Sequence, residues 1–127
     1  MAKYLSVFDY TGEAWSRMVA NPGDRSEAAR KLIEDMGGTM ECFYWMLGDH
    51  DGVVIYEAPD EATAAAIVGG VRASQLVRAI TTHQLVGPQV AGEALGLAAR
   101  ARAAYRPPGA PSGWRTEYDS MGTSAAN

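Results

Sequence analysis

The chain has 127 residues, of which 47% are apolar, and its formal net charge is −4. This length suits one domain, and the apolar fraction excludes disorder of the whole chain. Because no basic stripe stands out, neither nucleic acid nor an anionic membrane is an expected partner. A single cysteine, Cys42, is typical of a reducing compartment, and no apolar leader or long apolar run occurs. We therefore expect a cytoplasmic protein.

The first third of the chain predicts a strand followed by two helices. Successive residues of 4–10 would point to opposite sides of a strand, and both sides carry large apolar groups, which is typical of a central strand. Residues 13–20 place Trp15, Met18 and Val19 at helical spacing. A second helix is predicted from a cap at Asp24 or Ser26 as far as Gly37-Gly38.

A β-hairpin is predicted next, with strands at about 39–47 and 52–57. Its turn is the polar segment Gly48–Gly52, and aromatic and β-branched residues flank it on both sides. The run from Val53 to Tyr56 is apolar at consecutive positions, so both faces of this strand need to be covered.

The remaining pattern predicts a helix, a strand and a terminal helix. Asp60 is the expected N-cap of a helix that reaches Val71, residues 76–86 form a strand, and residues 90–104 form an alanine-rich helix. We expect residues 1–88 to be the main domain, 89–105 its extra helix, and 106–127 a Pro/Gly-rich tail. That tail would be flexible or would dock on a neighbouring subunit.

The order β-α-β-β-α-β plus a C-terminal helix predicts an α+β, ferredoxin-like sandwich. Helices would cover one face of the sheet. The other face would carry Tyr4, Phe8, Tyr10, Val53 and Ile55, or their alternates. Because so large an exposed apolar patch is rare on a monomer, we expect two sheets to pack together in a homodimer or a higher oligomer.

Several short motifs, in this order, resemble the GYD domain family. They are Lys3-Tyr4-Leu5, Tyr10-Thr11 with Trp15, Gly37-Gly38, Phe43-Tyr44-Trp45, Gly48, Asp51, Val53-Val54-Ile55, Pro59-Asp60 and Tyr105–Gly109. The chain departs from the family pattern at His50, where a tyrosine is usual. The resemblance implies a ferredoxin-like subunit of the dimeric α/β-barrel type and a homo-oligomer. It implies no particular reaction.

Three residues are candidates for catalysis: His50, His83 and Asp51. A histidine flanked by Asp49 and Asp51 could serve as a general base, although Gly, Asp and His are equally typical of a tight turn. His83 is a polar residue in an otherwise apolar strand. This pattern is typical of a strand that lines a pocket and also of an edge strand with one solvent-exposed face. Adjacent strand residues point in opposite directions, so we expect no metal site.

An aromatic set and one arginine are candidates for ligand binding: Tyr10, Trp15, Tyr44, Trp45, Tyr56 and Arg78. Aromatic side chains suit a flat hydrophobic ligand, but they also suit a core or a subunit interface. Arg78 could orient an anionic ligand or pair with a surface carboxylate.

Two functions therefore remain open. The first is a module that binds a small hydrophobic or aromatic molecule between sheet and helices. The alternative is a cofactor-free isomerase, cyclase or monooxygenase that acts on a polyketide-like or quinone-like metabolite. No P-loop, GxGxxG, CxxC, HExxH or GxSxG motif occurs, which argues against nucleotide-driven chemistry, zinc proteolysis and serine hydrolysis. We expect no cofactor.

Overall fold

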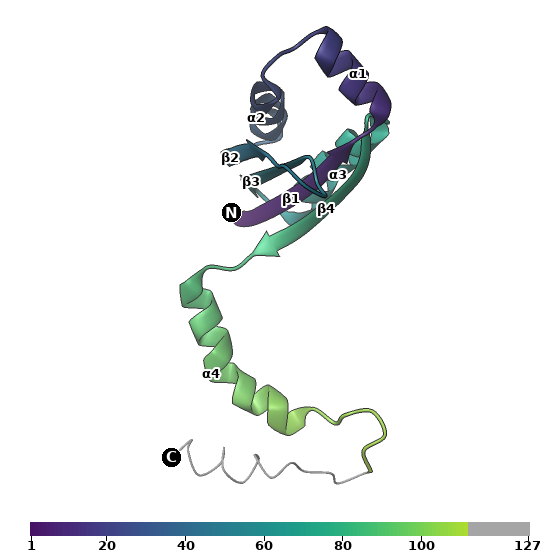
Figure 1. Ribbon diagram of the computed structural model, residues 1–127. Helices are drawn as coiled ribbons and strands as arrows, with labels where there is room; N and C mark the ends of the chain where they lie inside the picture. Colours follow the sequence, from purple (N-terminus) through teal and green to yellow (C-terminus); the bar gives the residue numbers. More distant parts are fainter. Residues whose placement is uncertain (112–127) are drawn as a thin grey trace. The chain divides into compact units, whose positions relative to one another are not determined.

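Four antiparallel strands form the sheet of the computed structural model, which describes residues 1–111 (Figure 1). The strands are β1 (Ala2–Tyr10), β2 (Thr39–Trp45), β3 (Gly52–Ala58) and β4 (Val77–Leu85). Their order in the sheet is β2-β3-β1-β4, so β1 pairs on both sides. The prediction of a central first strand is therefore confirmed, and β2 and β4 are the two edges.

Three helices complete this part of the chain: α1 (Gly12–Ala20), α2 (Arg25–Asp35) and α3 (Glu61–Ala73). The element order confirms the predicted α+β, ferredoxin-like fold. The predicted caps form as well, since Asp60 Oδ1 accepts a hydrogen bond from the Thr63 backbone N at 2.7 Å. After α2, Gly37 takes a φ of +85°, a conformation that glycine adopts without steric cost.

The core lies between the sheet and the helices α2 and α3. From the sheet it takes Tyr4, Phe8, Val54 and Tyr56, and from the helices Ile33 and Ile67, all of them buried. Burial of this apolar area is the main source of stability, at roughly 25 cal/mol for each Å².

The predicted grouping of residues on one sheet face is wrong in part. Tyr4 lies opposite Tyr56, and Ser6 lies opposite Val54, so these positions share the helix-covered face. Val53 and Ile55 therefore point to the other face, where they join Leu5 and Val7, because directly paired residues lie on the same side of a sheet. These four side chains are only half-buried within the described residues. We refer to them as the open sheet face.

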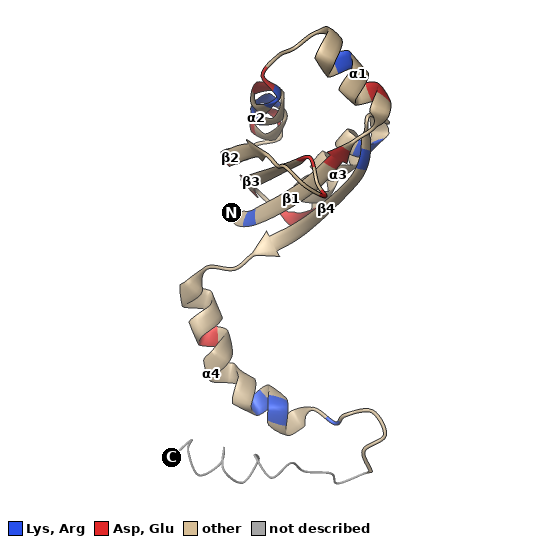
Figure 2. Cartoon of the chain, in the orientation of Figure 1, with Lys and Arg blue, Asp and Glu red and all other residues tan. Residues whose placement is uncertain are grey.

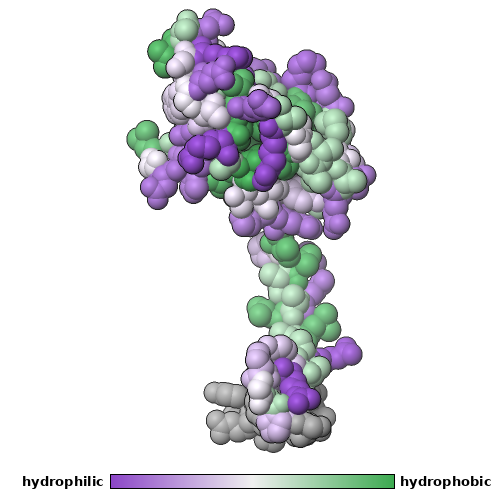
Figure 3. Space-filling view, turned by 90° about the vertical axis from the view of Figure 1, so that its right-hand side faces the viewer, coloured by the Kyte–Doolittle hydropathy of each residue, from purple (hydrophilic) through white to green (hydrophobic). Residues whose placement is uncertain are grey.

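The segment after Leu85 belongs to a second unit that contains α4 (Pro88–Ala104). This helix has no buried residue, and its apolar side chains, including Val90, Leu95 and Leu97, are exposed (Figure 3). The predicted role of the tail from 106 onwards falls largely on residues 112–127, which lie outside the described residues. Among residues 1–111, no helix combines the length and apolar character needed to cross a membrane.

Candidate functional site

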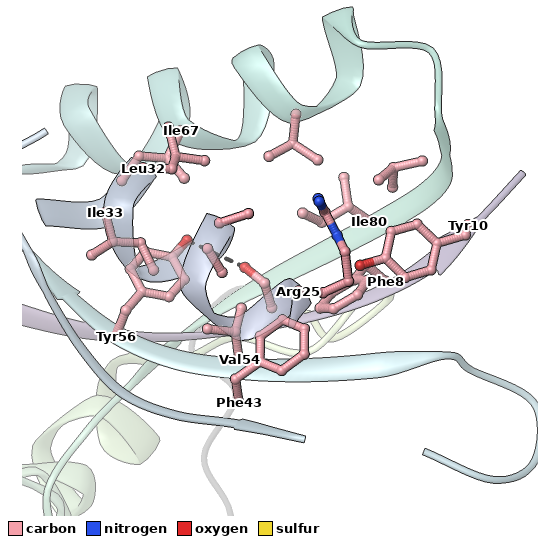
Figure 4. Close-up of a pocket in the computed structure, with 15 residues that line it drawn as sticks. Phe8, Tyr10, Arg25, Leu32, Ile33, Phe43, Val54, Tyr56, Ile67 and Ile80 are labelled. Carbon is pink, nitrogen blue, oxygen red and sulfur yellow. Dashed lines mark hydrogen bonds between the residues drawn. The ribbon is translucent and has the colours of Figure 1, made fainter. Parts of the chain in front are cut away.

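A cavity of about 120 Å³ lies between the sheet and the helices α2 and α3 (Figure 4). Most of its lining is apolar, and comprises Phe8, Ala28, Ala29, Leu32, Ile33, Phe43, Val54, Ile67, Val71, Val77 and Ile80. The polar lining residues are Ser6, Tyr10, Arg25 and Tyr56. Tyr10 and Tyr56 are thus the two predicted ligand-binding residues that line this cavity.

Three hydroxyl groups form a chain beside the cavity. Ser6 Oγ lies 3.2 Å from the Tyr56 hydroxyl and 2.7 Å from Thr82 Oγ1, so it links two strands that flank β1. Ser6 and Tyr56 are each 1% exposed. Because buried hydroxyl groups need partners, this chain satisfies part of the hydrogen-bonding capacity of both residues.

Arg25 reaches the cavity from the first position of α2. Its side chain is exposed to solvent and also lines the cavity, so Arg25 lies where the cavity opens to solvent. Figure 2 shows acidic and basic residues on each of the helices, and the basic residues of α4 are grouped near its C-terminal end. Arg25 is the one positively charged residue among those that line the cavity.

A separate polar cluster holds the β2–β3 loop against the end of β1. The Asp51 backbone N donates to Asp9 Oδ1 at 3.1 Å, and the Asp51 carboxylate accepts hydrogen bonds from Tyr10 and Trp15. His50 Nδ1 lies 3.3 Å from both Asp9 carboxylate oxygens. Arg78 Nη2 lies 3.6 Å from Asp9 Oδ2. His50, Asp51 and Arg78 thus meet at Asp9 and do not line the cavity.

Asp9 is the residue of this cluster that sequence reasoning missed. Its side chain is only 10% exposed, and a buried carboxylate requires paired charges and hydrogen-bond donors. An acidic residue within an apolar central strand was the signal that could have identified it. Within residues 1–111, no group of three or more His, Cys, Asp or Glu side chains could hold a metal ion.

Trp15 and Trp45 pack around Tyr10 next to the cavity. The ring centroids of Tyr10 and Trp45 are 5.7 Å apart, and those of Trp15 and Trp45 are 5.6 Å apart. Both tryptophans remain partly exposed and are absent from the cavity lining. They cover the end of β1 at which Asp51 is bound.

Tyr44 and His83 lie away from the cavity. Tyr44 pairs with Val53 and His83 pairs with Leu5, so both lie on the same side of the sheet as the open sheet face, and both are exposed. Leu5, the partner of His83, lies four positions before Asp9 on β1, which corresponds to about 13 Å along a strand. His83 and the His50–Asp9 pair therefore do not form one site.

Sequence reasoning also missed Ser6 and Arg25. Ser6 is a small polar residue in an otherwise apolar strand, and that contrast was its signal. Arg25 stands at the start of a helix, where a positive charge is unfavourable because the helix dipole is positive at that end. Both signals are weak until the tertiary structure places the two residues at one cavity.

The four-stranded antiparallel sheet and the two helices that cover it define a ferredoxin-like α+β domain. The GYD domain matches residues 4–95, and the chain belongs to this family. No curated protein matches the chain. A solved structure, "Crystal Structure of MtbAldR (Rv2779c)", is similar to it with a TM-score of 0.46 and 14% sequence identity. That match covers 68% of this chain and 52% of the other, so the chain matches about half the length of that structure.

Proposed function

We propose that this GYD domain protein binds a small hydrophobic or aromatic molecule in the cavity between the sheet and the helices α2 and α3. The observation that carries the proposal is the cavity itself. Its walls are aliphatic and aromatic, and its few polar groups converge from β1, β3 and α2. Concave, mostly apolar sites with a small number of polar groups are typical of small-molecule binding.

The size of the cavity limits the ligand. A volume of about 120 Å³ is below the roughly 300–1,000 Å³ of pockets that hold drug-sized molecules. An engineered cavity of about 150 Å³ with apolar walls binds benzene. The ligand that this cavity suits best is therefore a single ring.

We further propose that the protein acts as a homo-oligomer, with the open sheet face as the subunit contact. Leu5, Val7, Val53 and Ile55 are only half-buried within the described residues, although the helices cover the opposite face. A second copy that presents the same face would remove these side chains from water.

The alternative of a cofactor-free isomerase, cyclase or monooxygenase has less support. The candidate residues His50, His83 and Asp51 are absent from the cavity lining, and no other histidine or carboxylate lines it. Fused-ring, polyketide-like molecules also exceed the volume of the cavity. Binding without chemistry is the simpler function for these lining residues.

A titration with toluene tests the binding proposal. We expect saturable NMR shifts of the methyl groups of Ile33, Ile67 and Ile80, which line the cavity. The variant Ala29→Leu fills space in the cavity and should abolish these shifts. Ala66→Leu is the matched control, because Ala66 is exposed on α3 and does not line the cavity. An unchanged response in Ala29→Leu, or no response of the wild type to any single-ring aromatic compound, would contradict the proposal.

A further inference from the structure

The polar groups at the cavity point to a narrower class of ligand. We propose that the ligand is a single aromatic ring that carries both a hydroxyl and a carboxylate group, as in a hydroxybenzoate. The ring hydroxyl would meet Tyr56 and Ser6, and the carboxylate would meet Arg25. This inference rests on the proposed function and adds two specific contacts to it.

The hydroxyl end of the cavity follows from the chain formed by Tyr56, Ser6 and Thr82. Three hydroxyl groups carry three O–H donors, but the two links of the chain use only two of them. The third donor is the Tyr56 O–H if Thr82 donates to Ser6 and Ser6 donates to Tyr56. It is the Thr82 O–H if both links run the other way, and the Ser6 O–H if Tyr56 and Thr82 both donate to Ser6. Tyr56 can therefore donate to a ligand in the first arrangement and accept from it in the other two.

A purely hydrocarbon ligand would leave this capacity unused. Tyr56 and Ser6 are almost completely buried, and the rest of the wall beside them is apolar. Each hydroxyl of the chain already has a partner, so a ligand that supplies a hydrogen-bonding group here uses their remaining capacity, whereas a hydrocarbon does not. A hydroxyl group fits each arrangement of the chain, because it donates and accepts.

The charged end follows from Arg25. Within residues 1–111, its guanidinium group has no hydrogen bond or ion pair with a protein group, although Arg17 on α1 and Lys31 on α2 each pair with a carboxylate four residues away. At the first position of α2 it also opposes the helix dipole. A guanidinium group at a cavity mouth suits bidentate binding of a carboxylate.

The two ends are separated by the space that the ring would occupy. Figure 4 shows Arg25 beside Tyr10 on one side of the cavity, and Tyr56 on the other side. Val54 and Phe43 lie between them in this view, and Phe8 and Ile80 lie on the Arg25 side. An aromatic ring can thus lie in the apolar middle, while its two polar groups reach opposite ends.

Calorimetric titrations with 4-hydroxybenzoate, 3-hydroxybenzoate, benzoate, phenol and toluene test the inference. We expect one of the hydroxybenzoates to bind most tightly, because it makes both polar contacts. In Arg25→Gln, affinity for hydroxybenzoate and benzoate should fall on the order of tenfold, and affinity for phenol should not change. In Tyr56→Phe, affinity for hydroxybenzoate and phenol should fall by a similar factor, and affinity for benzoate should not.

Two controls accompany these variants. Arg30→Gln removes a positive charge from the same helix at a position that does not line the cavity, so it should leave all affinities unchanged. Ser6→Ala interrupts the hydroxyl chain and should show the same change in ligand selectivity as Tyr56→Phe. If one of these two variants does not fold, the other still tests the hydroxyl contact.

The outcomes separate this inference from the proposed function. If toluene binds as tightly as either hydroxybenzoate, or if Arg25→Gln and Arg30→Gln behave alike, the hydroxybenzoate class is wrong and binding in the cavity still stands. If none of the five compounds binds, both proposals fall.

Discussion

The indole of Trp15 and the carboxylate of Asp51 are joined by a hydrogen bond, with Nε1 3.2 Å from Oδ2. The same oxygen accepts the Tyr10 backbone N at 2.8 Å. One carboxylate in the β2–β3 loop therefore holds both the end of β1 and the helix α1 that follows it. Because Tyr10 also lines the cavity, this contact places one wall of the proposed binding site.

Asp51→Ala should destabilise the fold. The substitution leaves a part-buried backbone N and an indole N without their acceptor, which costs about 1–3 kcal/mol for hydrogen bonds to a charged group. Urea unfolding should show the loss as a lower midpoint with an unchanged slope. Asp49→Ala, at an exposed neighbouring position, is the control and should stay within about 0.5 kcal/mol of the wild type. Equal stability of the two variants would mean that Asp51 does not hold this region.

Two glycine-to-alanine substitutions should have opposite effects. A Cβ at Gly38 would collide with the Glu57 carbonyl oxygen and approach Ile33, so Gly38→Ala should cost about 1–3 kcal/mol. At Gly70, inside α3, nothing lies within 4 Å of a new Cβ. Gly70→Ala should therefore stabilise the protein by about 0.5–1 kcal/mol through helix propensity. Thermal unfolding of both variants measures the difference, and a destabilised Gly70→Ala would show that α3 has contacts at this position.

The helix caps should make stability depend on acid pH. Hydrogen bonds from the Ser26 side chain and backbone lower the pKa of Asp24, and those from Thr63 lower the pKa of Asp60. A lowered pKa in the folded state means that the stabilisation is present above the unfolded value of about 3.9 and is lost as the pH falls through the folded value. Asparagine also caps helices but does not titrate in this range.

The double variant Asp24→Asn/Asp60→Asn should therefore lose less stability than the wild type between about pH 5 and pH 2. Urea midpoints at a series of pH values measure this difference in slope. Asp49→Asn removes one carboxylate that has no hydrogen bond within the described residues, and it controls for the change in net charge. Parallel curves for the wild type and the double variant would mean that the caps do not contribute to acid sensitivity.

Ile55→Lys should weaken self-association, if the open sheet face is the subunit contact. Ile55 lies on the face opposite the helices and is only half-buried, so a lysine there places a charge in the proposed interface while the core is left intact. Sedimentation at micromolar concentration should show an oligomer for the wild type and smaller species for Ile55→Lys. Ala62→Lys, at an exposed position of α3, should sediment as the wild type does. A wild type that sediments as a single subunit would remove the proposed contact.

Much of the fold was predictable because its signals are local. The cap at Asp60 and the glycine after α2 act within a few residues, and both formed as predicted. The hairpin also formed, with strands that end at Trp45 and begin at Gly52. The assignment of side chains to sheet faces was less successful, since Val53 and Ile55 were grouped with Tyr4 but lie on the opposite side. A strand that is apolar on both sides contains no internal sign of which face the helices will cover.

The sequence by itself determined the order of the elements and most of the helix caps, because periodicity and capping depend on neighbours along the chain. Only the tertiary structure decided where chemistry could occur. Strand register brings Ser6 to Tyr56 and Thr82, which are 50 and 76 positions away along the chain. The packing of α2 on the sheet then brings Arg25 to the same cavity. Such contacts depend on pairing register and on helix placement over long separations, and no short stretch of residues contains that information.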